Sequence, residues 1–100
     1  MKIFKLLNAR RKFYETYPDL GPKELELLEQ VAIFEKKIYP LTITEAMEMN
    51  FTGSPASTHR YLDKLRAHDL LKIKQSDGRT KFLHLGVKGQ KYFNSLEKLL

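Results

Sequence analysis

Short polar and cationic side chains recur between residues 54 and 81 at spacings that suit the binding of phosphates and base edges. Ser57, Arg60 and Lys64 follow one another at intervals of three and four residues, which places them on one face of a helix. A guanidinium fork pairs with guanine or phosphate, and an ammonium group pairs with phosphate. An Asp-Gly pair further along is followed by two more cations. The candidate residues for such contacts are Ser54, Ala56, Ser57, Arg60, Lys64, Asp77, Arg79 and Lys81.

The first group of candidates requires a helix over residues 54–68. Ser54 has a hydroxyl that suits a helix cap, and Pro55 fits the first helical position. At about 100° per residue, Thr58, Leu62, Leu65 and Asp69 fall on one side of the helix, which we expect to face the core.

The other side of this helix is small near its start and basic further along, which suits a helix that enters a major groove N-terminus first. We expect Ser57 and Arg60 to contact a phosphate or base edges and Lys64 to contact phosphate. The simpler alternative is a polar face that only meets solvent.

The second group requires a two-stranded hairpin over residues 71–85. Two short runs alternate apolar and polar side chains as strands do, and Asp77-Gly78 between them suits a tight turn. Arg79 then lies at or beside the tip, where an arginine can enter a minor groove. Asp77 could hold its guanidinium by a charge-assisted hydrogen bond. The alternative is an ordinary turn with a surface arginine.

The remaining segments predict helices on both sides of this unit. Thr42 or Thr44 can cap a short helix just before the helix at 54–68. If Thr42 is the cap, Glu45 three residues on completes a capping box. Pro18 to Pro22 is the clearest break in the chain. The predicted elements are helices at 1–17, 22–39, 42–50, 54–68 and 87–100, and a hairpin at 71–85.

The helix at 22–39 shows two stripes. One is imperfect and holds Leu25, Leu28, Ala32, Glu35 and Tyr39, and the better one holds Leu27, Val31, Phe34 and Ile38. A short helix, a tight turn and a longer helix form a helix-turn-helix, and the hairpin that follows is a wing. The predicted fold class is therefore mainly α with a two-stranded β-wing. It is a winged helix-turn-helix in one domain, residues 1–100, with terminal helices available for dimerisation.

The charge of the chain indicates what kind of partner it binds. The net charge is +6, and the segment from Pro55 to Lys91 alone holds nine Lys or Arg against three Asp, which accounts for all of it. A basic helix and hairpin favour a polyanionic partner, and nucleic acid is the first candidate.

The absence of cysteine excludes disulfides and thiolate metal sites. No apolar run of membrane-spanning length occurs, so we expect a cytoplasmic protein without a membrane partner.

Catalysis is not indicated. The three histidines, His59, His68 and His84, lack the spacing of a metal-binding or catalytic motif. His59 and Asp63 lie four residues apart on one helix, and an ordinary surface ion pair explains them. We expect no enzyme activity, no cofactor and no metal.

The chain resembles the MarR family of bacterial winged-helix transcription regulators. The resemblance rests on SPASTHR at 54–60 and DGRTK at 77–81, and extends over about 41–93. It implies a homodimer whose recognition helices enter adjacent major grooves of double-stranded DNA while the wings reach the minor groove. It also implies that Asp77 and Arg79 are the usual wing pair. A small-molecule effector is compatible with the resemblance, but no residue pattern points to one.

The chain departs from the family pattern at three places. The turn at 50–53 is one residue longer than usual. Asp69 replaces the usual glycine after the recognition helix. Gly86 stands where a threonine commonly caps the last helix, so that helix is expected to start late or to fray.

Three other functions compete with DNA binding. A winged helix that binds proteins would expose an apolar patch on the recognition helix or wing. A single-stranded RNA reader would expose an aromatic platform, to which Tyr61 or Phe82 could contribute. A membrane-surface role would use the basic N-terminal helix. The small, cationic face of the recognition helix favours DNA over all three.

Overall fold

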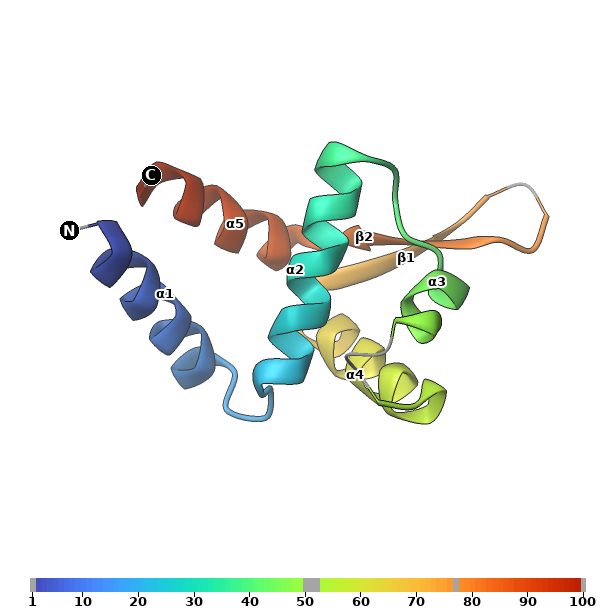
Figure 1. Ribbon diagram of the computed structural model, residues 1–100, viewed down its shortest axis with the longest axis horizontal. Helices are drawn as coiled ribbons and strands as arrows, with labels where there is room; N and C mark the ends of the chain where they lie inside the picture. Colours follow the sequence, from blue (N-terminus) through green and yellow to red (C-terminus); the bar gives the residue numbers. More distant parts are fainter. Residues whose placement is uncertain (1, 50–52, 77, 100) are drawn as a thin grey trace.

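The computed structural model describes residues 2–49, 53–76 and 78–99. Within these residues, five helices and two strands follow in the order expected for a winged helix (Figure 1). Their bounds are α1 Lys2–Thr16, α2 Pro22–Lys37, α3 Ile43–Glu48, α4 Pro55–Ala67, β1 Leu71–Gln75, β2 Lys81–Leu85 and α5 Val87–Leu99. The mainly α fold with a two-stranded wing is confirmed.

Helix α2 is the central element of the fold and packs on both α4 and β2. Its first two-thirds are buried on more than one face, because Leu25 and Leu28 are enclosed as fully as Leu27 and Val31. The better of the two predicted stripes is not buried at its end, where the side chain of Ile38 is 60% exposed. The helix stops at Lys37, and the N–H of Ile38 closes it by donating to the carbonyl of Phe34. Pro40 lies two residues beyond, so the chain cannot continue as a helix.

The wing is an antiparallel hairpin with Leu71 opposite Leu85 and Gln75 opposite Lys81. Leu83 in β2 is fully buried and its N–H donates to the carbonyl of Leu41, 2.7 Å away. A short stretch before α3 therefore pairs with the outer edge of β2, and an isolated bridge joins Thr42 to Phe82. This pairing fixes the wing relative to the start of α3.

The capping box predicted at Thr42 is confirmed. The hydroxyl of Thr42 accepts from the N–H of Glu45 at 3.1 Å, and the Glu45 carboxylate accepts from the N–H of Thr42 at 2.9 Å. That backbone hydrogen bond is the main reason why the pKa of Glu45 lies below its ordinary value. Helix α3 spans Ile43–Glu48 rather than 42–50, and the longer turn expected at 50–53 lies largely outside the described residues.

Asp69 and Gly86 form one structural unit, which explains both departures from the family pattern. Asp69 ends α4 in the left-handed region with φ of 58°. Its carbonyl accepts the N–H of Lys88 at 3.0 Å, in the first turn of α5. A Cβ on Gly86 would lie only 2.3 Å from that same carbonyl oxygen. The late or frayed start expected for α5 is therefore wrong: the helix begins at Val87, where the Asp69 carbonyl takes the place of a side-chain cap.

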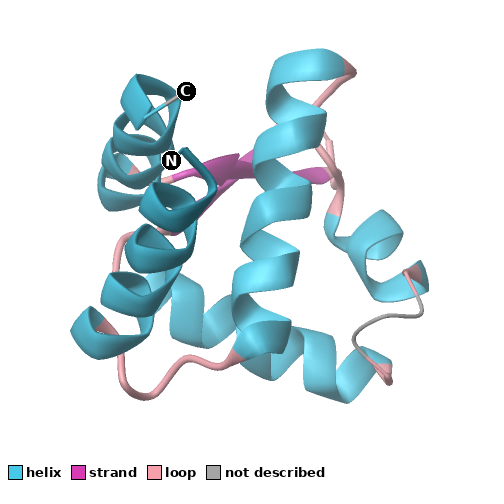
Figure 2. Ribbon diagram, turned by 60° about the vertical axis from the view of Figure 1, so that its left-hand side comes forward, coloured by secondary structure: helices cyan, strands magenta, loops and turns pink. Residues whose placement is uncertain are grey.

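Helices α1 and α5 lie beside each other at one end of the molecule, and α3, α4 and the wing lie at the other end (Figures 1 and 2). The chain extends 46 Å along its longest axis and 24 Å across the next. Aromatic contacts hold the base of the pair, with the ring of Phe13 5.0 Å from that of Tyr92. The molecule therefore presents a two-helix arm and a separate basic end.

Candidate nucleic-acid interface

The recognition helix α4 begins where the sequence predicts. The hydroxyl of Ser54 accepts the N–H of Ser57 at 3.2 Å, and Pro55 occupies the first helical position. The fully buried Thr58 turns its hydroxyl back to the carbonyl of Ser54 at 3.2 Å. These contacts fix the first turn, so the exposed Ser54 and Ala56 lie at a well-defined helix end.

Three candidate residues form a hydrogen-bonded line along the exposed face of α4. The hydroxyl of Ser54 donates to that of Ser57 at 3.0 Å, and Arg60 Nη2 donates to the Ser57 hydroxyl at 3.4 Å. This last contact is long and exposed. It orients the arginine side chain and leaves the other N–H donors of the guanidinium available. The arrangement therefore presents an accessible guanidinium and two hydroxyls at the start of the helix.

Lys64, which is expected to contact phosphate, contacts the start of α2 and the loop before it. Its ammonium lies 3.7 Å from a carboxylate oxygen of Glu24 and 3.4 Å from the carbonyl of Asp19. The Glu24 side chain is only 7% exposed, so it needs a nearby cation. The ammonium group of Lys64 therefore has partners within the protein.

His68 anchors the far end of α4 to the loop between α1 and α2. Its Nε2 lies 2.9 Å and 3.0 Å from the two carboxylate oxygens of Asp19. The ring of Tyr17 packs edge-on at 4.9 Å. The hydrogen bond from His68 holds the pKa of Asp19 below its ordinary value. Sequence analysis missed this pair, because 49 residues separate its members.

This pair leads to a pH-dependent prediction. Because the folded pKa of Asp19 lies below the ordinary value of 3.8, its stabilisation is complete above that value and is lost as the pH falls through the lowered pKa. We expect Asp19→Asn to reduce the free energy of unfolding at neutral pH, and the difference from the parent protein to shrink in strong acid. Urea unfolding at a series of pH values measures this. Asp63→Asn, an exposed aspartate on α4, is the control, and a loss that does not change with pH would contradict the assignment.

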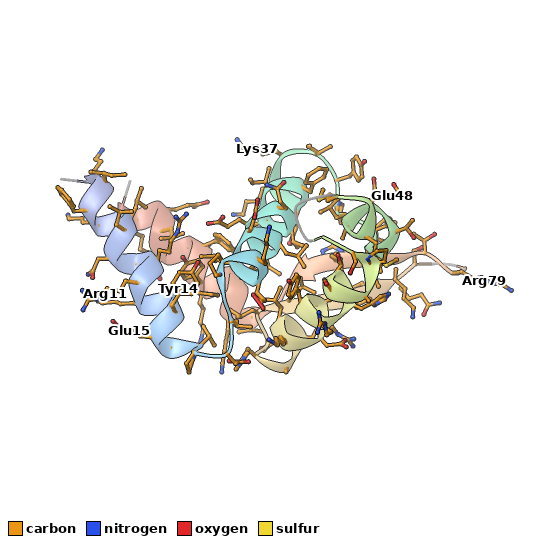
Figure 3. All side chains as sticks on the ribbon, turned by 60° about the horizontal axis from the view of Figure 1, so that its bottom comes forward. Arg11, Tyr14, Glu15, Lys37, Glu48 and Arg79 are labelled. Atoms are coloured by element: carbon orange, nitrogen blue, oxygen red, sulfur yellow. The ribbon has the colours of Figure 1, made fainter. Side chains whose placement is uncertain are left out.

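The tip of the wing is a short loop closed by backbone contacts. The N–H of Ser76 donates to the carbonyl of Thr80 at 3.0 Å, and Gly78 has φ of 98°, which favours glycine. The Gln75 amide donates to the carbonyl of Gly78 at 2.9 Å. Arg79 is exposed and points away from the body of the molecule (Figure 3). Asp77, the expected partner of Arg79, lies outside the described residues, so their pairing stays a prediction.

A groove of about 530 Å³ separates the recognition helix from the wing. Helix α3 and the residue that caps it form a third wall of this groove. The lining residues are Thr42, Ile43, Thr44, His59, Arg79, Thr80 and Lys81. The structure thus brings together two predicted site residues, Arg79 and Lys81, with His59, Thr44 and Thr80, which the sequence analysis did not assign.

The expected pair of His59 with Asp63 is not among the contacts of the described residues. Asp63 lies 4.0 Å from Arg66 instead. A helical wheel indicates that His59 is exposed, but it does not show which element lies opposite. The wing and α3 reach His59 only through packing across the fold, so no local signal in the sequence could have identified this groove.

The opposite end of the molecule carries exposed apolar side chains. Ile3, Phe4 and Leu7 of α1 are all half exposed or more, with Phe4 at 64%. A second groove, of about 360 Å³, runs between α1 and α5 and includes Phe13, Tyr92, Leu96 and Leu99 among its lining residues. This end therefore carries apolar surface that the single chain does not cover.

The described residues contain neither a metal-ligand cluster nor a membrane-spanning helix. In the parts of the chain covered by the structure, no three or more His, Asp or Glu side chains converge as metal ligands would. Within the same residues, no helix has both the length and the apolar character needed to cross a membrane.

Comparison with known proteins supports the fold. No protein-family model and no curated protein matches the sequence. Among solved structures, the chain is similar to MepR, described as a transcription regulator of the Staphylococcus aureus multidrug efflux pump MepA. The TM-score is 0.66 at 14% sequence identity, over 97% of this chain and 73% of that one. This similarity confirms the winged-helix fold.

Proposed function

We propose that this protein is a sequence-specific, double-stranded DNA-binding transcription regulator that acts as a homodimer. The observation that carries the proposal is the position of the exposed polar face of α4 beside a wing with a protruding Arg79 (Figures 1 and 3). A helix and a wing at one end of a molecule match the pattern of a major-groove contact beside a minor-groove contact.

Each candidate residue has its own part in this proposal. Ser57 and Arg60 contact base edges, and the small Ala56 allows close approach. Ser54 contacts phosphate at the helix end. Lys64 contributes less to DNA binding, because it contacts Glu24 and Asp19.

In the wing, Arg79 enters the minor groove, where the negative potential is focused. Asp77 orients Arg79, and Lys81 pairs with phosphate at the base of the wing.

The apolar end supplies the dimer contact in this proposal. A stripe of Ile3, Phe4 and Leu7 and the groove beside α5 would be covered by the same elements of a second copy. Two copies would present two recognition helices to two half-sites, and the resemblance to MarR proteins implies this same arrangement. The proposal also includes action in the bacterial cytoplasm, where the target promoter would lie.

A winged helix that binds a protein through α4 is the alternative. Such a surface needs exposed apolar side chains on the recognition helix or the wing. Among the described residues, the large apolar side chains that are exposed lie in α1, in α2 and the loop after it, and at the start of α5, at Ile3, Phe4, Leu7, Ile33, Ile38, Tyr39 and Val87. The exposed face of α4 is polar, which favours DNA.

Arg60→Ala tests the proposal. A preferred duplex is first selected from a random library with the parent protein, and its Kd is compared with that of a random duplex. We expect Arg60→Ala to weaken binding to the selected duplex by about tenfold to a hundredfold, with a smaller loss on the random duplex, because a bidentate contact to guanine distinguishes bases. The preference for the selected sequence therefore falls.

Arg66→Ala is the matched control, because it removes the same charge from an exposed position of α4 near Asp63. It should leave the ratio of the two Kd values unchanged. Equal effects of both substitutions on that ratio would remove the base-reading role of Arg60.

A further inference from the structure

The groove between α3, α4 and the wing has the composition of an anion site. Arg79 and Lys81 line it from the wing and His59 lines it from α4, together with three threonines. Among the described residues that line it, none carries a carboxylate. The nearby carboxylate of Glu45 is already occupied by the N–H of Thr42 and by the hydroxyl of Tyr39, 2.7 Å away.

Several donors in this groove are available. The hydroxyl of Thr42 is used to cap α3, since it accepts from the N–H of Glu45. In contrast, the His59 ring and the Thr44 hydroxyl make no hydrogen bond to any described residue, and both side chains are exposed. Thr44 lies within α3, two residues after Thr42, so it is held by the same capped turn. Two polar groups on different helices therefore line the same space without a partner in the described part of the chain.

The geometry of duplex DNA indicates what should occupy this space. The major groove is about 12 Å wide and the minor groove about 6 Å wide, and one sugar–phosphate strand separates each major groove from the next minor groove. A protein that places α4 in the first and Arg79 in the second must therefore accommodate that strand between them. The groove of about 530 Å³ lies between these two elements.

We propose that this groove binds the sugar–phosphate strand that separates the two DNA grooves, with His59 and Thr44 as donors to one of its phosphates. The inference rests on the proposed function and adds to it a backbone contact that does not depend on the base sequence. Thr80 and Lys81 complete the site from the wing. Because phosphate contacts fix register without reading sequence, these residues set affinity and the relative position of helix and wing.

The double variant Thr44→Val/His59→Gln tests this site. Both positions are exposed, so the fold is expected to persist, and thermal unfolding checks this. We expect Kd to rise by about tenfold for a selected duplex and by the same factor for a random duplex, because hydrogen bonds to a charged phosphate are lost in both cases. His84→Gln is the control, since His84 lies outside the groove and its Nδ1 is 3.7 Å from Glu35.

The outcomes separate this inference from the proposed function. If the parent protein binds no duplex, the proposed function fails first. If the parent binds and the double variant stays within about twofold of it, this phosphate site is wrong while the function stands. A loss confined to the selected duplex would make His59 or Thr44 a base contact and would also overturn the inference.

A further measurement identifies the source of the phosphate. Inorganic phosphate replaces chloride at constant ionic strength in the same titration. We expect the Kd of the parent protein to stay unchanged, because one free phosphate lacks the helix and wing contacts of the duplex. Strong competition that the double variant abolishes would assign the groove to free phosphate instead and overturn the inference.

Discussion

Phe4→Glu/Leu7→Glu is expected to convert the protein into a folded monomer that binds duplex DNA about a hundredfold or more weakly. Both side chains are at least half exposed in the single chain, so the substitutions cost little within it. Two carboxylates in an apolar contact would prevent the association of two copies. Each carboxylate would lose its hydration without gaining a cation or a hydrogen-bond donor in return. A monomer carries one recognition helix, so binding to one half-site no longer holds a second recognition helix at high effective concentration beside the other half-site. Light scattering after gel filtration gives the mass, and a DNA titration gives the affinity.

Lys2→Gln/Lys5→Gln is the matched control for this variant. It lowers the net charge by the same two units at exposed positions of α1, without placing charge on the apolar stripe. The control should remain dimeric and lose only the small part of affinity that long-range charge provides. A parent protein that is already monomeric, or a double variant that stays dimeric, would contradict the assignment of α1 to the dimer contact.

Gly89→Ala is expected to destabilise the fold, although alanine normally favours a helix over glycine. A Cβ at this position would lie 2.1 Å from the backbone oxygen of Leu70 and 3.4 Å from Leu85 Cδ2. Because the closest atom belongs to the backbone, α5 or the chain before β1 must move. We expect a loss of about 1–3 kcal/mol in the free energy of unfolding, measured by urea denaturation.

Asn94→Ala provides the control for helix propensity on α5, at an exposed position. It should change the free energy of unfolding by no more than about 0.5 kcal/mol. A Gly89→Ala protein as stable as the parent would show that α5 is not held against Leu70 as closely as these distances indicate.

Local chemistry made the elements of the fold predictable. A capping box and a Ser-Pro pair involve residues no more than three apart in the sequence. Thr42 with Glu45 and Ser54 with Pro55 therefore mark helix starts, and the structure confirms both. The alternation in the wing likewise places Leu83 and Leu85 in the core. These signals need no knowledge of the rest of the chain.

The errors arise where distant segments meet. The predicted fraying of α5 ignored the carbonyl of Asp69, which reaches Lys88 only in the folded chain. The phosphate contact expected of Lys64 stays a prediction, but a helical wheel cannot show that Glu24 lies 3.7 Å from its ammonium group. Burial of Glu24 comes from packing of α2 on α4, and a buried carboxylate then recruits a cation.

The candidate interface was predictable in part for the same reason. Ser57 and Arg60 are three residues apart on one helix, and their contact follows from that spacing. The groove that joins His59 to the wing depends on how β2 pairs with Leu41 beside α3, which no pattern of period two or 3.6 encodes. Sequence alone therefore predicts the elements of the interface and misses the space between them.

A titration of duplex DNA at several salt concentrations tests the central claim most directly. If Arg60, Arg79 and Lys81 of each subunit of a homodimer displace counterions when they bind in the grooves and at the backbone of DNA, six cations act together. The logarithm of the association constant should then fall with the logarithm of salt concentration with a slope of about −5. Binding that falls in this way, with a preference for one selected sequence, is the result that we predict. No binding at low salt, or binding that does not depend on salt, would contradict the claim that this winged helix is a DNA-binding protein.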